Sequence, residues 1–212
     1  MKKLALLGAS GHGKVVADMA EDLGWKEIYF FDDAWPEIRE NSHWQVAGDT
    51  SALLSRVHEF DGIIVTIGDC FIRWSKQLQL QNSGATLLSL AHPQAVISKY
   101  AKLGVGSVVM AGAVINADAS VGDACIINTG STVDHDCVLG NSVHVSPGAH
   151  LSGDVTVGEC TWIGVGVSIR QGITIGSSVV IGAGSVVVKD LSNNLITYGN
   201  PAIARPLNTS RS

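Results

Sequence analysis

The sequence predicts two structural classes in series, a small α/β unit followed by a β-solenoid. Two observations carry this prediction: a glycine-rich turn between two short apolar runs near the N-terminus, and a six-residue spacing of aliphatic residues between positions 97 and 188. Neither the 3.6-residue period of a helix nor the alternation of an ordinary strand produces a spacing of six. We therefore expect one domain over residues 1–93 and a repeat domain over residues 94–212.

The N-terminal domain is expected to be Rossmann-like. Residues 3–7 form an apolar run typical of a buried parallel strand, and the turn from Gly8 to Lys14 follows it directly. A helix is expected over about 13–24 and a second strand over 27–31, which ends in Asp32 and Asp33. This order of elements places a phosphate at a helix N-terminus and a carboxylate near a ribose or base.

The spacing of the glycines narrows the choice of ligand. It is Gly-x-x-Gly-x-Gly, whereas the dinucleotide fingerprint is Gly-x-Gly-x-x-Gly, so a nicotinamide-dependent enzyme is disfavoured. A phosphate site at a helix terminus needs backbone N–H groups rather than one spacing, so a nucleotide remains the expected ligand. Further elements are expected as a helix over 50–58, a strand over 62–69 that contains Gly68 near its end, a helix over 71–82 and a strand over 85–90.

The six-residue spacing continues without a break through the repeat domain. Its aliphatic members are Ile97, Leu103, Val109, Ile115, Val121, Ile127, Val133, Leu139, Val145, Leu151, Val157, Ile163, Ile169, Ile175, Ile181 and Val187. Two residues before each member from Leu103 onward lies a small or β-branched residue, such as Ala113, Cys125, Cys137 or Ala149. One apolar and one compact residue that repeat at a fixed short period indicate a β-solenoid, whose interior both series fill.

Glycine follows many of the aliphatic members, at positions 104, 122, 140, 158, 164, 176 and 182. In this respect the chain resembles the hexapeptide-repeat acyltransferases. The resemblance implies a left-handed parallel β-helix with three hexads in each triangular coil, so that residues 18 apart stack. Gly104, Gly122, Gly140, Gly158 and Gly176 then share one corner, where glycine is expected to permit tight turning.

Composition excludes several classes of function. Of the 212 residues, 46% are hydrophobic and 16% are charged, and the net charge is −5, so the chain is globular and has no basic field for a nucleic acid. The N-terminal apolar run is too short for a signal peptide, no later segment suits a membrane span, and a cytoplasmic location is expected. The four cysteines include no close-spaced pair of the kind that binds zinc, and we expect no metal.

Histidines and acids are densest between Ile127 and Gly153. His135 has Asp136 beside it, which suits acyl transfer, because a histidine can remove the proton of an attacking amine while a carboxylate raises its basicity. Gly153 follows 18 residues later, so we expect it one coil above His135, where its backbone N–H can stabilise an oxyanion. His150 also lies outside the inward series, and we expect it to be a solvated side chain.

The combined pattern resembles the sialic acid O-acetyltransferase type family, and within it the nucleotide-sugar N-acetyltransferases. The matching parts are the glycine loop, the paired acids and the segments 132–137 and 144–149. The resemblance implies His135 as the general base, with Asp136 beside it where many relatives carry Glu. It also implies nucleotide-sugar contacts at Ser10, Gly11, His12, Asp32, Asp33 and Gly68, and acetyl-coenzyme A contacts at His144, Gly153, Val165 and Ala183.

The function implied is acetylation of the 4-amino group of a nucleotide-linked 4-amino-4,6-dideoxy sugar for bacterial surface glycans, by a homotrimer with clefts between adjacent subunits. Uridine is the favoured nucleotide, with GDP-perosamine N-acetylation and sialic acid O-acetylation as alternatives. A solenoid zinc hydratase is a remote alternative that needs three convergent histidines. A third class is a non-catalytic nucleotide-sugar sensor or scaffold, which would release no thiol from acetyl-coenzyme A. Near the C-terminus, Arg205 stands close to the position where the family has a basic residue for the coenzyme phosphates.

Overall fold

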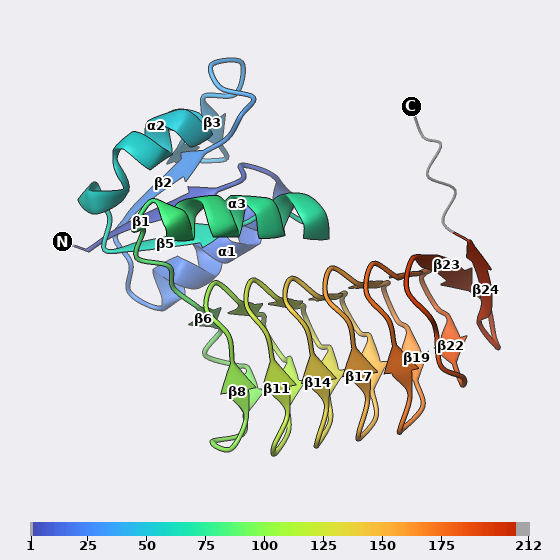
Figure 1. Ribbon diagram of the computed structural model, residues 1–212. Helices are drawn as coiled ribbons and strands as arrows, with labels where there is room; N and C mark the ends of the chain where they lie inside the picture. The colour runs from blue at the N-terminus through green and yellow to red at the C-terminus, as the bar shows by residue number, and fades with distance from the viewer. Residues whose placement is uncertain (1, 207–212) are drawn as a thin grey trace. The chain divides into compact units, whose positions relative to one another are not determined.

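The structure is a computed structural model that describes residues 2–206. The chain divides into two compact units, Met1–Pro93 and Gln94–Ser212. Figure 1 shows helices and strands in the first unit and stacked coils in the second. Among residues 2–206, no helix has the length and apolar character needed to cross a membrane.

A three-stranded parallel sheet in the order β2-β1-β5 lies at the centre of the N-terminal unit. Its central strand β1 (Lys3–Leu7) pairs with β2 (Glu27–Phe31) on one side and β5 (Gly62–Val65) on the other. The strand expected over 85–90 is reduced to one bridge between Ile63 and Leu87, in which Ile63 donates to the carbonyl of Thr86 and accepts the N–H of Leu88. The two-residue strand β6 (Leu90–Ala91) comes next.

Three helices connect and follow these strands: α1 (Gly11–Asp22), α2 (Thr50–Ser55) and α3 (Cys70–Asn82). α1 begins two residues before the expected start, because the two glycines in its first turn give no apolar signal. The helix expected over 50–58 is divided into α2 and a 3-10 turn, Val57–Glu59. Asp49 and Asp69 cap α2 and α3, because their carboxylates accept the N–H groups of Ala52 at 2.8 Å and Ile72 at 2.9 Å.

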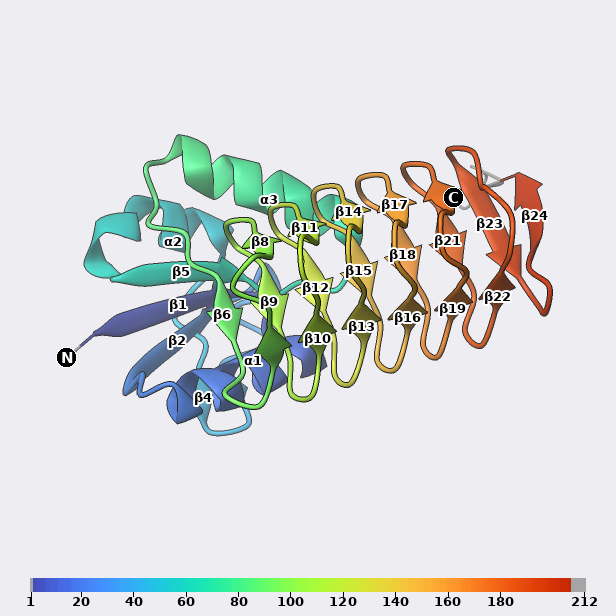
Figure 2. The ribbon, with the colours of Figure 1, turned by 90° about the horizontal axis from the view of Figure 1, so that it is seen from below.

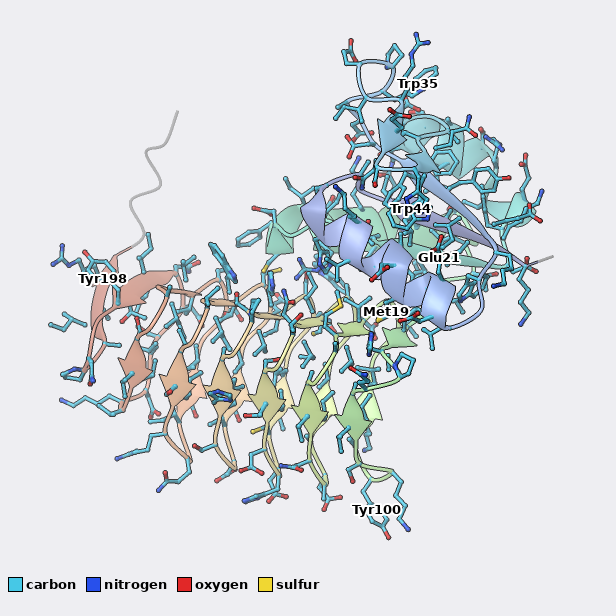
Figure 3. All side chains as sticks on the ribbon, turned by 180° about the vertical axis from the view of Figure 1, so that it is seen from behind. Met19, Glu21, Trp35, Trp44, Tyr100 and Tyr198 are labelled. Atoms are coloured by element: carbon cyan, nitrogen blue, oxygen red, sulfur yellow. The ribbon has the colours of Figure 1, made fainter. Side chains whose placement is uncertain are left out.

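A short hairpin that the sequence does not predict lies between β2 and α2. It consists of β3 (Glu40–Asn41) and β4 (Trp44–Gln45), which pair antiparallel. The buried ring of Trp44 packs edge-on against Phe30, with ring centroids 6.2 Å apart. Its Nε1 donates to Oε1 of Glu21 at 3.0 Å, and both residues are labelled in Figure 3. Val46, which is 2% exposed, also forms a bridge to Phe30, so the segment is held by two buried apolar residues that are too isolated to give a strand pattern.

The C-terminal unit is a three-sided parallel β-helix made of two-residue strands (Figure 2). The β7 face contains β7 (Val96–Ile97), β10 (Val114–Ile115), β13 (Thr132–Val133), β16 (His150–Leu151), β19 (Ser168–Ile169) and β22 (Val186–Val187). The β8 face contains β8 (Lys102–Leu103), β11 (Ser120–Val121), β14 (Val138–Leu139), β17 (Thr156–Val157) and β20 (Thr174–Ile175). The β9 face contains β9 (Val108–Val109), β12 (Ile126–Ile127), β15 (His144–Val145), β18 (Trp162–Ile163) and β21 (Val180–Ile181).

The stacking interval of 18 residues is confirmed by the strand register. On the β7 face, Val133 lies opposite Leu151, and on the β9 face Val145 lies opposite Ile163. The aliphatic and compact series both point inward: Val133 and Cys137 are 0% exposed. Burial of each such aliphatic side chain contributes about 1.5–3 kcal/mol, so the six-residue spacing supplies the free energy that holds the coils together.

The glycines that follow the aliphatic residues have a different role from the one expected. The corner residues 104, 122, 140, 158 and 176 are absent from the positive-φ glycines, so they do not serve as left-handed turns. Instead, a Cβ on Gly140 would lie 2.7 Å from the backbone nitrogen of Glu159 on the next coil. Glycine is required there by the close approach of neighbouring coils. The left-handed residues of this corner lie two positions later, as at Ser142 with φ 55°.

The solenoid ends in a β-hairpin of β23 (Leu195–Tyr198) and β24 (Ile203–Pro206). β23 pairs in parallel with β21, so the hairpin continues the β9 face (Figure 1). The guanidinium of Arg205 lies 5.2 Å from the ring centroid of Tyr198. Arg205, which stands close to the basic position implied by the resemblance, therefore lies over an exposed aromatic ring of the terminal hairpin.

Candidate active site

A cavity of about 340 Å³ opens at the carboxyl ends of the three parallel strands of the N-terminal unit. Its lining residues are Leu7, Gly8, Ser10, Asp32, Asp33, Ile67, Gly68, Ile72 and Lys76. Ligands of open α/β sheets collect at this edge. Of the six residues that the sequence assigns to the nucleotide sugar, four line the cavity, whereas Gly11 and His12 do not.

The carboxylate of Asp32 positions the backbone of the glycine loop. One carboxylate oxygen of Asp32 accepts the N–H of Ala9 at 2.7 Å, and the other accepts the N–H of Ala34 at 2.9 Å. Beyond the loop, burial lowers the pKa of His12 to about 4, assisted by the charge of Arg73, so the imidazole is neutral at pH 7. Asp32 thus acts on the shape of the loop, and His12 adds no charge to the start of α1.

Asp33 links three elements around the cavity. Its Oδ1 accepts the N–H of Thr50 at 3.0 Å, and its Oδ2 lies 2.6 Å from Nζ of Lys76 on α3. Partial burial raises the pKa of Asp33, but the hydrogen bonds from Lys76 and Thr50 outweigh it and lower that pKa to about 2. The carboxylate is therefore ionised and paired throughout the physiological range.

The turn after β5 is fixed by Arg73, which the sequence analysis missed. The side chain of Arg73 is 1% exposed, and its Nη1 donates to the carbonyl oxygens of Ile67 and Gly68, both at 2.8 Å. A buried guanidinium that holds two carbonyls defines the position of Gly68 in the cavity wall.

In the C-terminal unit, His135 and Asp136 lie in the turn between β13 and β14. We call the turns that join the β7 face to the β8 face the His135 corner. Nδ1 of His135 is 2.7 Å from Oδ2 of Asp136, so the shorter aspartate does reach the ring. Asp136 has a left-handed backbone, φ 61°, which Asp118 and Asp154 share at the equivalent positions of the neighbouring coils. Nε2 is then the nitrogen left for chemistry.

The environment of His135 increases its basicity. The hydrogen bond to Asp136 raises the pKa of the imidazole, and the charges of Asp134, Asp136 and Asp154 add to the effect. Asp134 in turn accepts the backbone N–H of His135 at 2.8 Å and the side-chain amide of Asn116 at 2.8 Å. The ring is thus oriented through its Nδ1 and its own backbone.

Gly153 lies one coil above His135 at the same corner. The backbone N–H of Asp154 donates to the carbonyl of His135 at 2.9 Å, and a Cβ on Gly153 would lie 2.5 Å from Nε2 of His135. Within residues 2–206, the neighbouring N–H groups of Ser152 and Asp154 bind carbonyl oxygens, while that of Gly153 binds no protein acceptor. The predicted stacking of these two residues is present, and it leaves a donor beside the base.

Replacement of Asp136 by Asn is expected to shift the pH dependence of catalysis. A base must be neutral, so activity is lost as pH falls through the pKa of His135, and Asp136 raises that pKa. Asp136→Asn should therefore move the acidic limb of the kcat/KM profile to lower pH and reduce its plateau by about ten- to a hundredfold. A pH–rate profile of both proteins tests this, and an unmoved acidic limb would contradict a role for Asp136 in tuning the base.

His144 lies on the β9 face, away from the His135 corner. Its Nε2 is 3.2 Å from Nδ2 of Asn128, and its ring stacks on Trp162, one coil above, with centroids 6.2 Å apart. Trp162 donates from Nε1 to Oγ of Ser146 at 2.8 Å. Asn128 and Trp162 thus set the position of the imidazole. The 18-residue interval predicts the Trp162 stack, but no sequence signal marks Asn128.

His150 lies on the β7 face, where its Nδ1 contacts Oγ1 of Thr132 at 3.0 Å. His135, His144 and His150 therefore belong to one corner and two different faces. Throughout the described part of the chain, no group of three or more His, Cys, Asp or Glu side chains has the arrangement of a metal site.

Val165 and Ala183 lie in the turns that join the β9 face to the β7 face, which we call the Val165 corner. Their stacking is shown by the N–H of Gly184, which donates to the carbonyl of Val165 at 2.8 Å. Val165 is 54% exposed although it is a large apolar residue, so this corner presents apolar surface to solvent. The β7 face separates it from the His135 corner.

Comparison with known proteins covers both units. Residues 3–80 match the family model of the PglD N-terminal domain. The acetyltransferase domain of PglB from Neisseria gonorrhoeae is 44% identical, with a TM-score of 0.91 over 97% of this chain and 100% of that one. The chain belongs to the hexapeptide-repeat nucleotide-sugar N-acetyltransferase family. The coils of this family fold have the left-handed sense that the resemblance implied.

Two further members of this acetyltransferase family are similar to the chain. PerB from Caulobacter crescentus was solved with CoA and GDP-perosamine; it is 37% identical, with a TM-score of 0.92 over 97% of this chain and 98% of that one. The UDP-N-acetylbacillosamine N-acetyltransferase of Bacillus subtilis is 34% identical over 113 residues, which is 52% of this chain. The match spans about half the length of that curated relative. The PglB domain was also solved with acetyl coenzyme A.

Proposed function

We propose that the protein is an N-acetyltransferase that moves an acetyl group from acetyl-coenzyme A to the 4-amino group of a nucleotide-linked 4-amino-4,6-dideoxy sugar. The observation that carries the proposal is the hydrogen-bonded pair of His135 and Asp136, 2.7 Å apart, directly below Gly153. Support comes from relatives solved with acetyl coenzyme A and with GDP-perosamine. The proposal includes a cytoplasmic location, because both charged co-substrates are retained by membranes.

In the proposed reaction the sugar amine attacks the thioester carbon, and Nε2 of His135 accepts the amine proton as the C–N bond forms. The carbonyl oxygen becomes an oxyanion that accepts a hydrogen bond from the N–H of Gly153. The C–S bond then breaks, and the proton passes from His135 to the departing thiolate. The products are the N-acetyl sugar and the free thiol of coenzyme A.

We assign the two substrates to the two units as the resemblance implies. The nucleotide takes the cavity at Ser10, Asp32, Asp33 and Gly68, with Gly11 and His12 at the start of α1 beside the diphosphate. Acetyl-coenzyme A takes His144, Gly153, Val165 and Ala183. A linear pantetheine chain suits the stacked carbonyl and N–H groups along the Val165 corner.

The experiment that tests this function is a mass-spectrometric screen. The purified protein is incubated with acetyl-coenzyme A and with UDP- or GDP-linked 4-amino-4,6-dideoxy sugars, and free thiol is measured in parallel. We expect one nucleotide series to gain the mass of an acetyl group with stoichiometric thiol release. Both nucleotides are included because the relatives include a UDP-sugar enzyme and a GDP-sugar complex. Nucleotide binding without thiol release would support a sensor and overturn the proposal.

We expect a homotrimer in solution. His135 and Val165 lie at different corners, so one β-helix cannot bring its own Val165 corner to its own base. A neighbouring β-helix that packs beside the first can supply that corner, and three such contacts close a ring. Light scattering combined with activity at decreasing protein concentration tests this expectation. A fully active monomer would refute the shared site.

A further inference from the structure

We propose that Lys76 binds the nucleotide sugar by donating a hydrogen bond to the nucleoside half of the molecule. The inference deepens the proposed function, because it takes a nucleotide as the ligand of the N-terminal cavity. Lys76 lines that cavity, and its side chain is only 20% exposed. Neither the glycine loop nor the acid pair points to it in the sequence, because it lies in the middle of α3.

The ammonium of Lys76 is already oriented before a ligand arrives. Nζ lies 2.6 Å from Oδ2 of Asp33 and 2.7 Å from Oγ1 of Thr50. An ammonium has three N–H donors in a tetrahedral arrangement, so these two acceptors determine the direction of the third. A lysine normally loses much side-chain entropy when it binds a ligand, and here most of that loss has occurred on folding.

The position of Lys76 places its third N–H donor near the nucleoside rather than near the diphosphate. In sheets of this type the diphosphate sits at the N-terminus of the helix after the first strand, and the acid at the end of the second strand meets the ribose. Asp33 is that acid, and Lys76 is bound directly to it. The third donor of Lys76 is therefore on the ribose and base side of the cavity.

The pair also has the chemistry that a nucleoside requires. Asp33 remains ionised, since its pKa is lowered to about 2, so an acceptor and a charged donor lie side by side. A ribose hydroxyl can donate to one and accept from the other. A keto base offers the same combination through its adjacent C=O and N–H groups. Apolar contact from Ile67 and Ile72, which line the same cavity, suits the flat face of a base.

A purely structural role for Lys76 makes a different prediction. If the ammonium only joined α3 to the loop after β2, its loss would lower the unfolding temperature and leave the affinity of the folded protein unchanged. Exposed or half-exposed ion pairs contribute little to stability, so the folded state is expected to persist. The test must therefore separate affinity from stability.

The experiment compares Lys76→Met and Lys76→Gln with the wild type by isothermal titration calorimetry. UDP and GDP are titrated first, and the tighter nucleotide is then used with its monophosphate. We expect Lys76→Met to weaken the diphosphate and the monophosphate by the same factor, about tenfold, as for one lost charge-assisted hydrogen bond. Lys76→Gln, which keeps a donor, should lose less. Lys26→Met is the matched control, because Lys26 is exposed before β2 at the opposite end of the sheet.

Unchanged affinity in both Lys76 variants would overturn the inference, as would a loss confined to the diphosphate. Thermal unfolding of each variant is recorded in parallel, and a lower unfolding temperature with wild-type affinity would leave only the structural role. Acetyl transfer is measured separately. If the wild type binds nucleotide but transfers no acetyl group, the proposed function is overturned, while the inference that Lys76 binds the nucleotide is unaffected. If the wild type transfers acetyl groups and the Lys76→Met variant keeps wild-type nucleotide affinity, only the inference about Lys76 is overturned.

Discussion

His135→Ala is expected to lower turnover by about two to four orders of magnitude, the usual contribution of a general base. The imidazole is the only group beside Gly153 whose basicity is raised by a bonded carboxylate among the described residues. Nucleotide binding should persist, because the cavity lies in the N-terminal unit and contains no residue of the His135 corner. Single-turnover release of thiol measures the chemical step, and calorimetry measures binding.

His150→Ala is the matched control for this substitution. His150 is an exposed histidine on the β7 face, and its side chain contacts that of Thr132. Its loss should leave turnover near that of the wild type. Near-normal turnover in His135→Ala would remove His135 from the mechanism. A large loss in both variants would indicate a general effect on the β-helix.

The β-helix could be predicted from the sequence because its determinants are local and periodic. Each hexad places one aliphatic residue inward, and the same spacing recurs from Ile97 to Val187, so every coil repeats the same information. The pairing of His135 with Gly153 followed from the same interval of 18 residues. The role of the corner glycines did not follow, because the distance between neighbouring coils is a property of packing that no single hexad contains.

The nucleotide cavity could be predicted only in part. The glycine loop and the acids after β2 are marked by their neighbours in the chain, and four of the six expected residues line the cavity. Lys76 and Arg73 come from α3, and Lys76 meets Asp33 across 43 residues of sequence. Such contacts depend on how a helix packs on a sheet, and the α3 pattern gives only its apolar face. The hairpin around Trp44 was missed for a similar reason, because Trp44 contacts residues of α1 and β2 that are distant in the sequence.

Gly153→Val is expected to fold and assemble normally, yet to lose at least roughly a hundredfold in turnover, the effect of one lost oxyanion donor. Gly153 is absent from the positive-φ residues, so the backbone accepts a side chain. The inward neighbours Leu151 and Val155 are 1% and 0% exposed and are left in place. A Cβ at position 153 would overlap the His135 ring, 2.5 Å from its Nε2, so the valine must displace the imidazole as well as enter the space where the acetyl group is expected.

Gly24→Asn serves as the control outside the β-helix. Gly24 has φ 90° and open space around its Cβ position, and asparagine tolerates a left-handed backbone better than other residues with a side chain. We expect a modest change in stability and turnover close to that of the wild type. Circular dichroism and light scattering on both variants separate a chemical defect from a folding defect. A Gly153→Val protein that was merely misfolded would carry no information about the oxyanion.

The decisive comparison places Gly153→Val in the His135→Ala background. If the valine acted only by displacing the imidazole, it would lower the rate no further once the imidazole had been removed. A valine that also blocks the approach of the thioester to the N–H of Gly153 should cost about another tenfold or more, because the two groups act on different atoms of the transition state. Single-turnover thiol release in the four proteins gives the coupling. Equal rates in the single His135→Ala and the double variant would show that the N–H of Gly153 donates nothing to the oxyanion.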